Sequence, residues 1–147
     1  SVWTDPAQAV LQADSRTGVV LNRAQQYVWE RGNIKTQLTL NTEDVPEVIR
    51  SGSWDKGKLQ EGLGDSGTVI DLTGCSLENV LYEISAQRAV IAKTGADTSV
   101  VIVGYDAYNT WLLDPATGKV SPYGMNDSTA LFQQAGNVFI SYLDNQK

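Results

Sequence analysis

Short apolar runs separated by polar turns dominate the second half of the chain. The continuous apolar run at residues 100–103 is typical of a central strand that is covered on both faces. We predict that this run belongs to a strand over residues 98–105. Further runs are short, rich in β-branched residues and bounded by turn residues, which predicts strands at 69–72, 89–92, 109–114 and 138–142.

Two helices are predicted between these strands. Apolar residues recur at helical spacing in residues 76–87, at Leu77, Val80, Leu81 and Ile84, and Ser76 can cap the start of that helix. A second helix is predicted over residues 127–136, because polar capping residues open it and Gly136 ends it.

The first half predicts helices and a hairpin. Thr4 or Asp5 can cap a helix that continues to Asp14, and residues 19–29 suit a hairpin. Alternation at residues 34–40 predicts a half-buried strand, and a helix is expected over 43–50. The glycine- and serine-rich stretch that follows, to Gly67, is interpreted as a surface loop or lid.

These elements together predict an α+β fold, with N-terminal helices and a mainly antiparallel sheet on which one or two helices pack. A chain of 147 residues has the length of one domain, so we expect a single domain over 1–147. Its helical and hairpin half spans 1–68 and its sheet half spans 69–147. The chain begins at Ser1 without a signal-peptide pattern, as an excised fragment of a larger protein would.

Composition excludes several classes of function. The net charge is −6 and the 11 basic residues are scattered, which argues against a nucleic-acid partner or an anionic membrane surface. No apolar run is long enough to insert into a membrane. A single cysteine, Cys75, excludes an internal disulfide, and the lack of histidine leaves no Cys/His metal cluster. We expect no metal and no cofactor.

The order of motifs from Leu72 to Tyr142 resembles the C-terminal half of a C39-like peptidase domain, a member of the papain-like superfamily. A helix is followed by a strand at residues 88–92, then by the long apolar strand that ends in Gly104-Tyr105-Asp106. The next strand ends in Asp114-Pro115, and a helix with an aromatic residue follows at 128–132.

The resemblance implies a cysteine nucleophile, a histidine base before the Gly-Tyr-Asp strand, and an aspartate that orients the imidazole. The base position falls on Thr98, and Asp114 matches the aspartate. The nucleophile would lie within residues 3–14, where there is no cysteine. Since a threonine cannot accept a proton near neutral pH, the resemblance implies a degenerate peptidase without catalytic residues.

Two other residues are site candidates. Cys75 precedes a predicted helix, where backbone amides can activate a thiol, but we expect it to be a buried, unreactive core residue because it adjoins the apolar stripe of that helix. Trp54 lies in the predicted loop and could anchor a peptide or a sugar if it is exposed. The carboxylates of Glu43, Asp44 and Glu47 are expected on one solvent-facing helix.

The sequence therefore favours a non-catalytic binding or assembly domain of a larger bacterial protein, with an extended peptide or another protein domain as its partner. The resemblance favours an extracellular or cell-surface location. One alternative is an enzyme that uses Cys75 with a base supplied from elsewhere. Another is a purely structural spacer domain.

Overall fold

A computed structural model describes residues 38–144. In these residues seven strands form one sheet, and every strand pairing is antiparallel. The helix and hairpin expected within residues 4–29 lie outside the described part of the chain. The α+β class and the mainly antiparallel sheet are confirmed.

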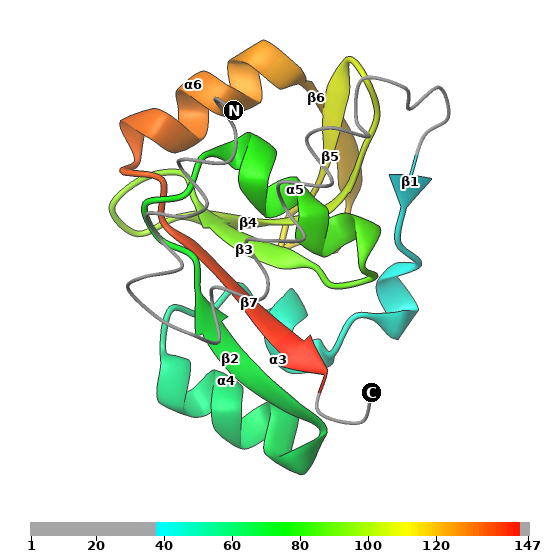
Figure 1. Ribbon diagram of the computed structural model, residues 1–147, viewed down its shortest axis with the longest axis vertical. Helices are drawn as coiled ribbons and strands as arrows, with labels where there is room; N and C mark the ends of the chain where they lie inside the picture. The colour runs from blue at the N-terminus through cyan, green and yellow to red at the C-terminus, as the bar shows by residue number, and fades with distance from the viewer. Residues whose placement is uncertain (1–37, 145–147) are drawn as a thin grey trace, which may run out of the picture.

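The sheet has the order β2-β7-β3-β4-β5-β6, and β1 pairs separately with the C-terminal end of β4. Neighbours in the sheet are therefore not always neighbours in sequence, and β7, the last strand, lies between β2 and β3 (Figure 1). The strands are β1 (Leu38–Thr39), β2 (Gly67–Asp71), β3 (Val90–Lys93), β4 (Ser99–Tyr105), β5 (Asn109–Leu113), β6 (Val120–Gly124) and β7 (Phe139–Asp144).

Four α-helices accompany the sheet in the described region. They are α3 (Glu47–Arg50), α4 (Lys56–Leu63), α5 (Leu77–Ser85) and α6 (Met125–Gln134). Two short 3-10 helices, η1 (Thr42–Asp44) and η2 (Gly64–Ser66), lie before α3 and after α4.

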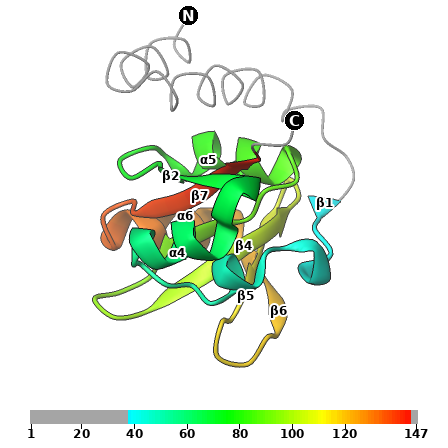
Figure 2. The same ribbon diagram turned by 90° about the horizontal axis from the view of Figure 1, so that it is seen from below.

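Helices α5 and α4 cover opposite faces of the sheet (Figures 1 and 2). Lys56 of α4 forms an ion pair with Asp71, whereas Ser85 of α5 hydrogen-bonds with Tyr105. Strand register and side-chain alternation put Asp71 and Tyr105 on opposite faces. Helix α6 shares the face of α5, because its Ser128 hydroxyl lies 2.7 Å from that of Thr110, which pairs with Tyr105.

The core follows the pattern of apolar residues. Val101, Ile102 and Val103 of β4 are fully buried, which confirms the central strand covered on both faces. The apolar stripe of α5 is buried as well, and Ser76 caps that helix by accepting a hydrogen bond from the Asn79 amide at 3.3 Å.

The continuous helix expected over 43–50 is wrong. Residues 42–44 form η1 and α3 begins only at Glu47, with Val45 extended at φ −80°, ψ 128°. Pro46 explains the break, because the residue before a proline avoids the helical region. Glu43 and Asp44 are therefore not on one helix with Glu47.

The loop expected from Ser51 to Gly67 is also wrong, since α4 occupies its middle. Asp55 caps α4 by accepting a hydrogen bond from the Lys58 amide at 3.1 Å, and Gly64 ends it with a φ of 60°. The two glycines inside this helix disguised it in the sequence, because glycine is a poor helix former. Leu59 and Leu63 nevertheless bury one side of α4 in the core.

Strand β6 was missed altogether. It contains Pro122 and its residues are mostly exposed, so it lacks the apolar alternation by which strands are recognised. The other predicted strands in the second half are present within one or two residues of their expected ends.

Candidate functional site

Thr98 and Asp114 lie at the same end of the sheet, Thr98 just before β4 and Asp114 just after the neighbouring strand β5. Val101 pairs with Leu113, so Asp114 follows directly beside Val100 of β4. Alternation along both strands puts Thr98 and Asp114 on the face that α5 and α6 cover. The topology therefore brings together the two positions that the motif order assigns to a base and its orienting carboxylate.

Both side chains are engaged in their own turns. The Thr94 hydroxyl donates to the Thr98 hydroxyl at 2.9 Å, and the Thr94 amide donates to the Thr98 carbonyl at 3.0 Å. The exposed Asp114 carboxylate accepts a hydrogen bond from the Ala116 amide at 2.9 Å, as expected for an Asp-Pro turn. Neither residue can pair with an imidazole of this chain, because the sequence holds no histidine.

Cys75 is buried between β2 and α5 and retains only 4% of its exposure. Burial raises the pKa of its thiol from an ordinary 9.0 to about 11, and the negative charges of Asp71 and Glu83 add to that rise. A cysteine nucleophile needs the opposite shift, toward thiolate at neutral pH. The burial predicted for this residue is confirmed.

Trp54 lies just before α4, half-buried against the core. It is thus less exposed than its place in a predicted loop suggested. Among the described residues, no group of acidic or cysteine side chains is arranged to hold a metal ion. No helix in residues 38–144 has the length and apolar character needed to cross a membrane.

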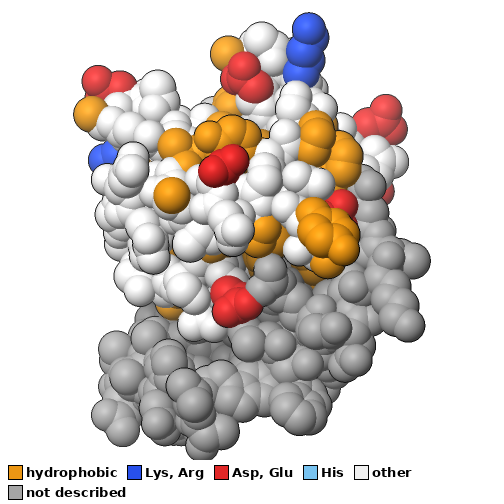
Figure 3. All heavy atoms as spheres, turned by 90° about the horizontal axis from the view of Figure 1, so that it is seen from above, with side chains coloured by type: hydrophobic (Ala, Val, Ile, Leu, Met, Phe, Trp, Pro, Cys, Tyr) orange, Lys and Arg blue, Asp and Glu red, His pale blue; other side chains and the backbone are white. Residues whose placement is uncertain are grey.

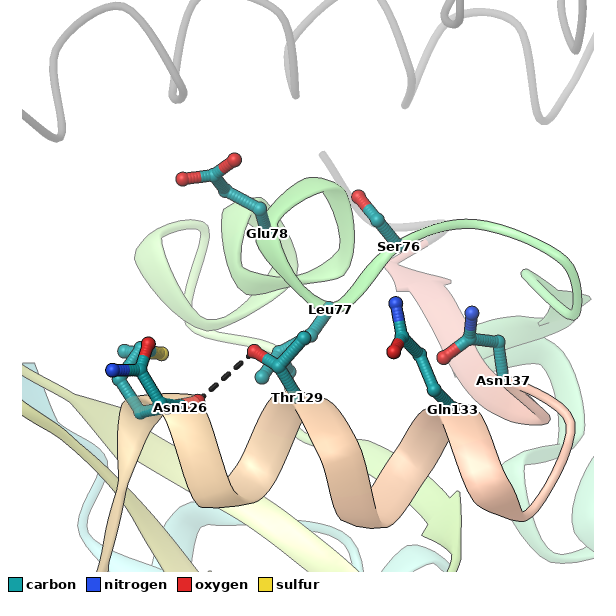
Figure 4. A pocket seen from close by; sticks show the side chains of 8 residues that line it. Ser76, Leu77, Glu78, Asn126, Thr129, Gln133 and Asn137 are labelled. Carbon is teal, nitrogen blue, oxygen red and sulfur yellow. Dashed lines mark hydrogen bonds between the residues drawn. The ribbon is translucent and has the colours of Figure 1, made fainter.

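A groove of about 230 Å³ lies between the start of α5 and one side of α6. Asn126, Thr129 and Gln133 follow one another along α6, and Asn137 continues the row beyond the helix (Figure 4). Figure 4 shows the Gln133 and Asn137 side chains directed toward the segment that carries Ser76. The remaining lining residues are Leu77, Glu78 and Met125.

Several polar side chains of this groove form no hydrogen bond with other described residues. Thr129 donates to the Met125 carbonyl at 2.9 Å, but no hydrogen bond is found for the Asn126 or Gln133 side chains within the described region. The buried Oδ1 of Asn137 also lacks a partner there. The sequence did not lead to these residues as a site. Asn126, Thr129 and Gln133 are spaced three and four residues apart, as on one face of a helix, but the predicted helix began only after Asn126.

Both outer edges of the sheet, by contrast, are obstructed. At β2 the Gln60 side chain of α4 takes the place of a neighbouring strand: it donates to the Gly67 carbonyl at 2.9 Å and accepts from the Val69 amide at 3.0 Å. At β6 the proline at position 122 has no N–H to offer. These are devices that limit strand addition at exposed edges.

A buried ion pair holds the end of α5 to the strand that follows it. Arg88 donates from Nε to Glu83 Oε1 at 2.8 Å, and both side chains are almost fully buried, at 8% and 0% exposure. Within residues 38–144 the Nη2 of Arg88 has no hydrogen-bond partner. Arg88 lies at a hollow of about 300 Å³, but Asp44 and Asp144 at that hollow make it unattractive to anions.

Comparison with solved structures gives a match to the fold. The chain superimposes on the crystal structure of a "putative C39-like peptidase from Bacillus anthracis" with a TM-score of 0.52 and 20% sequence identity, over 60% of this chain and 56% of that protein. The fold is that of a C39-like peptidase. No family model matches the sequence, and no curated protein matches it significantly.

The likeness concerns the fold alone. At 20% identity, residue roles do not transfer by similarity, and fold alone does not give function. This chain spans just over half of the length of the matched protein. What the C39-like fold does here must therefore be argued from the side chains described above.

Proposed function

We propose that this chain is a non-catalytic C39-like domain that binds an extended peptide, or an extended segment of another protein. The observation that carries the proposal is the occupant of the base position. Thr98 stands there with its hydroxyl bonded to Thr94, in a sequence without a histidine. General acid-base assistance is typically worth 10²–10⁴-fold in rate, and the sequence holds no histidine to supply it beside Asp114.

Cys75 gives little support to an enzymatic alternative. Its thiol is buried and its pKa lies at about 11, so very little thiolate is present near neutral pH. A base supplied from another domain would have to reach a side chain that is 4% exposed. We therefore place the function in binding.

The test uses the purified chain and a mixed-sequence peptide pool, with Cys75→Ala as the companion variant. Retention is measured by fluorescence anisotropy of labelled peptides, and cleavage by mass spectrometry of new termini. We expect both proteins to retain peptides and neither to cleave them. Cleavage by the wild-type chain that disappears in Cys75→Ala would overturn the proposal, and a lack of any retention would favour a spacer domain.

We also propose that the domain belongs to a larger bacterial protein exposed at the cell surface, which rests on the C39-like resemblance. Antibody labelling of intact cells of the source organism, compared with lysed cells, is the measurement. Labelling only after lysis would contradict the surface location.

A further inference from the structure

We infer that the groove between α5 and α6 is the place where an extended peptide backbone binds. This inference rests on the proposed binding function and adds a site to it. Three side-chain amides line the groove, from Asn126, Gln133 and Asn137, and a hydroxyl from Thr129 lies among them. Together they form a row of about two helical turns with one residue beyond the helix.

The chemistry of the row matches a peptide unit. A carboxamide offers both an N–H donor and a carbonyl acceptor, which are the two groups that each peptide bond requires. The Asn137 Oδ1 is buried without a partner, and buried acceptors of this kind are usually satisfied in native structures. A backbone N–H laid along the groove would supply a donor to Oδ1 once the Asn137 carboxamide rotates to direct this atom into the groove.

The surroundings disfavour other ligand classes. Among residues 38–144 no aromatic side chain lines the groove, whereas sugar sites usually rely on one for stacking. Figure 3 shows acidic side chains at several places on the face seen from above and few basic ones, and Glu78 lines the groove, so a phosphate would meet negative charge there rather than cations. A volume of about 230 Å³ is below the roughly 300–1,000 Å³ of drug-sized ligand sites, so it fits a short stretch of peptide.

The groove is a better candidate for peptide binding than either outer edge of the sheet, because both edges are obstructed. Peptides often bind by adding a strand to a free edge. Here Gln60 already occupies the outer edge of β2, and Pro122 interrupts that of β6. A peptide at β2 would have to displace Gln60, while the amides of the groove are available without any such exchange.

The chain offers a matched pair of variants for the test. Gln133→Ala removes an amide that lines the groove, whereas Gln134→Ala removes the same exposed side chain from the adjacent position, which does not line it. The probe is a fluorescein-labelled mixed-sequence decapeptide pool, titrated with the full chain and followed by anisotropy. A second pool carries N-methyl groups on its backbone, which removes the N–H donors.

We expect Gln133→Ala and Asn126→Ala each to weaken binding of the pool about two- to tenfold, the usual effect of one neutral hydrogen bond. Gln134→Ala should stay within about twofold of the wild type, and the N-methylated pool should bind at least tenfold more weakly. Equal affinity of Gln133→Ala and Gln134→Ala for the first pool would overturn the assignment of the groove while leaving the binding function standing. No binding by the wild type would instead remove the proposed function itself. Tighter binding of a neutral tetrasaccharide than of the peptide pool would overturn the peptide class.

Discussion

The most direct consequence of the structure for chemistry concerns the reactivity of Cys75. A thiol attacks only as its thiolate, so the pKa sets the reactive fraction. With a pKa of about 11, about one thiol in a thousand is ionised at pH 8, against about one in ten for a thiol at 9.0. Because a thiolate of higher pKa is also a better nucleophile, we expect the shifted pKa alone to slow the reaction of native Cys75 with an aromatic disulfide reagent about ten- to fifteenfold relative to the unfolded chain.

Burial should widen that difference. At 4% exposure the sulfur is reached by a bulky reagent only when β2 and α5 separate locally, and such opening is a minor population in a stable core. The assay follows release of the coloured thiolate at pH 8, once in buffer and once in guanidinium chloride, with Cys75→Ala as the blank. Similar rates in the two solvents would refute both the burial and the raised pKa.

The remaining predictions concern stability. Because folding raises the pKa of Cys75, the protonated thiol contributes to the free energy of unfolding below about pH 9, and this contribution is lost between pH 9 and 11. Over that interval the free energy of unfolding of the wild type, measured by denaturant titration, should fall by roughly 2–3 kcal/mol more than that of Cys75→Ala. Equal losses in the two proteins would contradict this. Gly104→Ala should cost about 1–3 kcal/mol in thermal unfolding, since its new methyl would lie 2.5 Å from the Leu38 carbonyl oxygen; an unchanged melting temperature would oppose this. Arg88→Met should cost about 3–5 kcal/mol by leaving Glu83 without its ion pair, and adding Glu83→Gln should restore part of it; no restoration would count against the pair. Asp55→Ala should cost about 1 kcal/mol through loss of the α4 cap, whereas no change in urea denaturation would show that the cap is dispensable.

The sheet could be predicted because its signal is local. Strand β4 is a run of β-branched residues that glycine and polar residues bound, and the capping residue of α5 stands next to its apolar stripe. Elements of this kind carry their whole pattern within ten residues. Their partners cannot be deduced in the same way, because the place of β7 between β2 and β3 depends on contacts between distant segments.

The missed elements depend on tertiary contacts that override local preference. Helix α4 has two glycines, and its formation is supported by Leu59 and Leu63 in the core and by the two bonds from Gln60 to β2. Strand β6 carries a proline and pairs along its whole length with β5. Helix propensity and strand propensity are both weak beside such contacts.

The candidate site also has a part that local sequence patterns predict and a part that depends on contacts between distant segments. The neighbouring positions of Thr98 and Asp114 could be predicted, because they follow from two strands and one hairpin. The groove could not, because it needs the approach of α5 to α6, which lie about forty residues apart in sequence. In the sequence nothing distinguishes the amide side chains of the groove from other polar residues. Only the packing of α5 beside α6 makes them line one groove.

Asp114 illustrates why a residue can match a catalytic position without indicating catalysis. Its carboxylate accepts a hydrogen bond from the Ala116 amide. Backbone hydrogen bonds from Asp114 to Lys119 and from Gly118 to Asp114 close the turn between β5 and β6. Those bonds are needed for the turn whether or not an imidazole lies nearby. Asp114 alone is therefore not evidence of catalysis. Whether the chain is catalytic depends on the position that the motif order assigns to the base, and there the hydroxyl of Thr98 is hydrogen-bonded within its own turn. The needs of the turn are thus enough to account for the Asp-Pro pair without a catalytic role for Asp114.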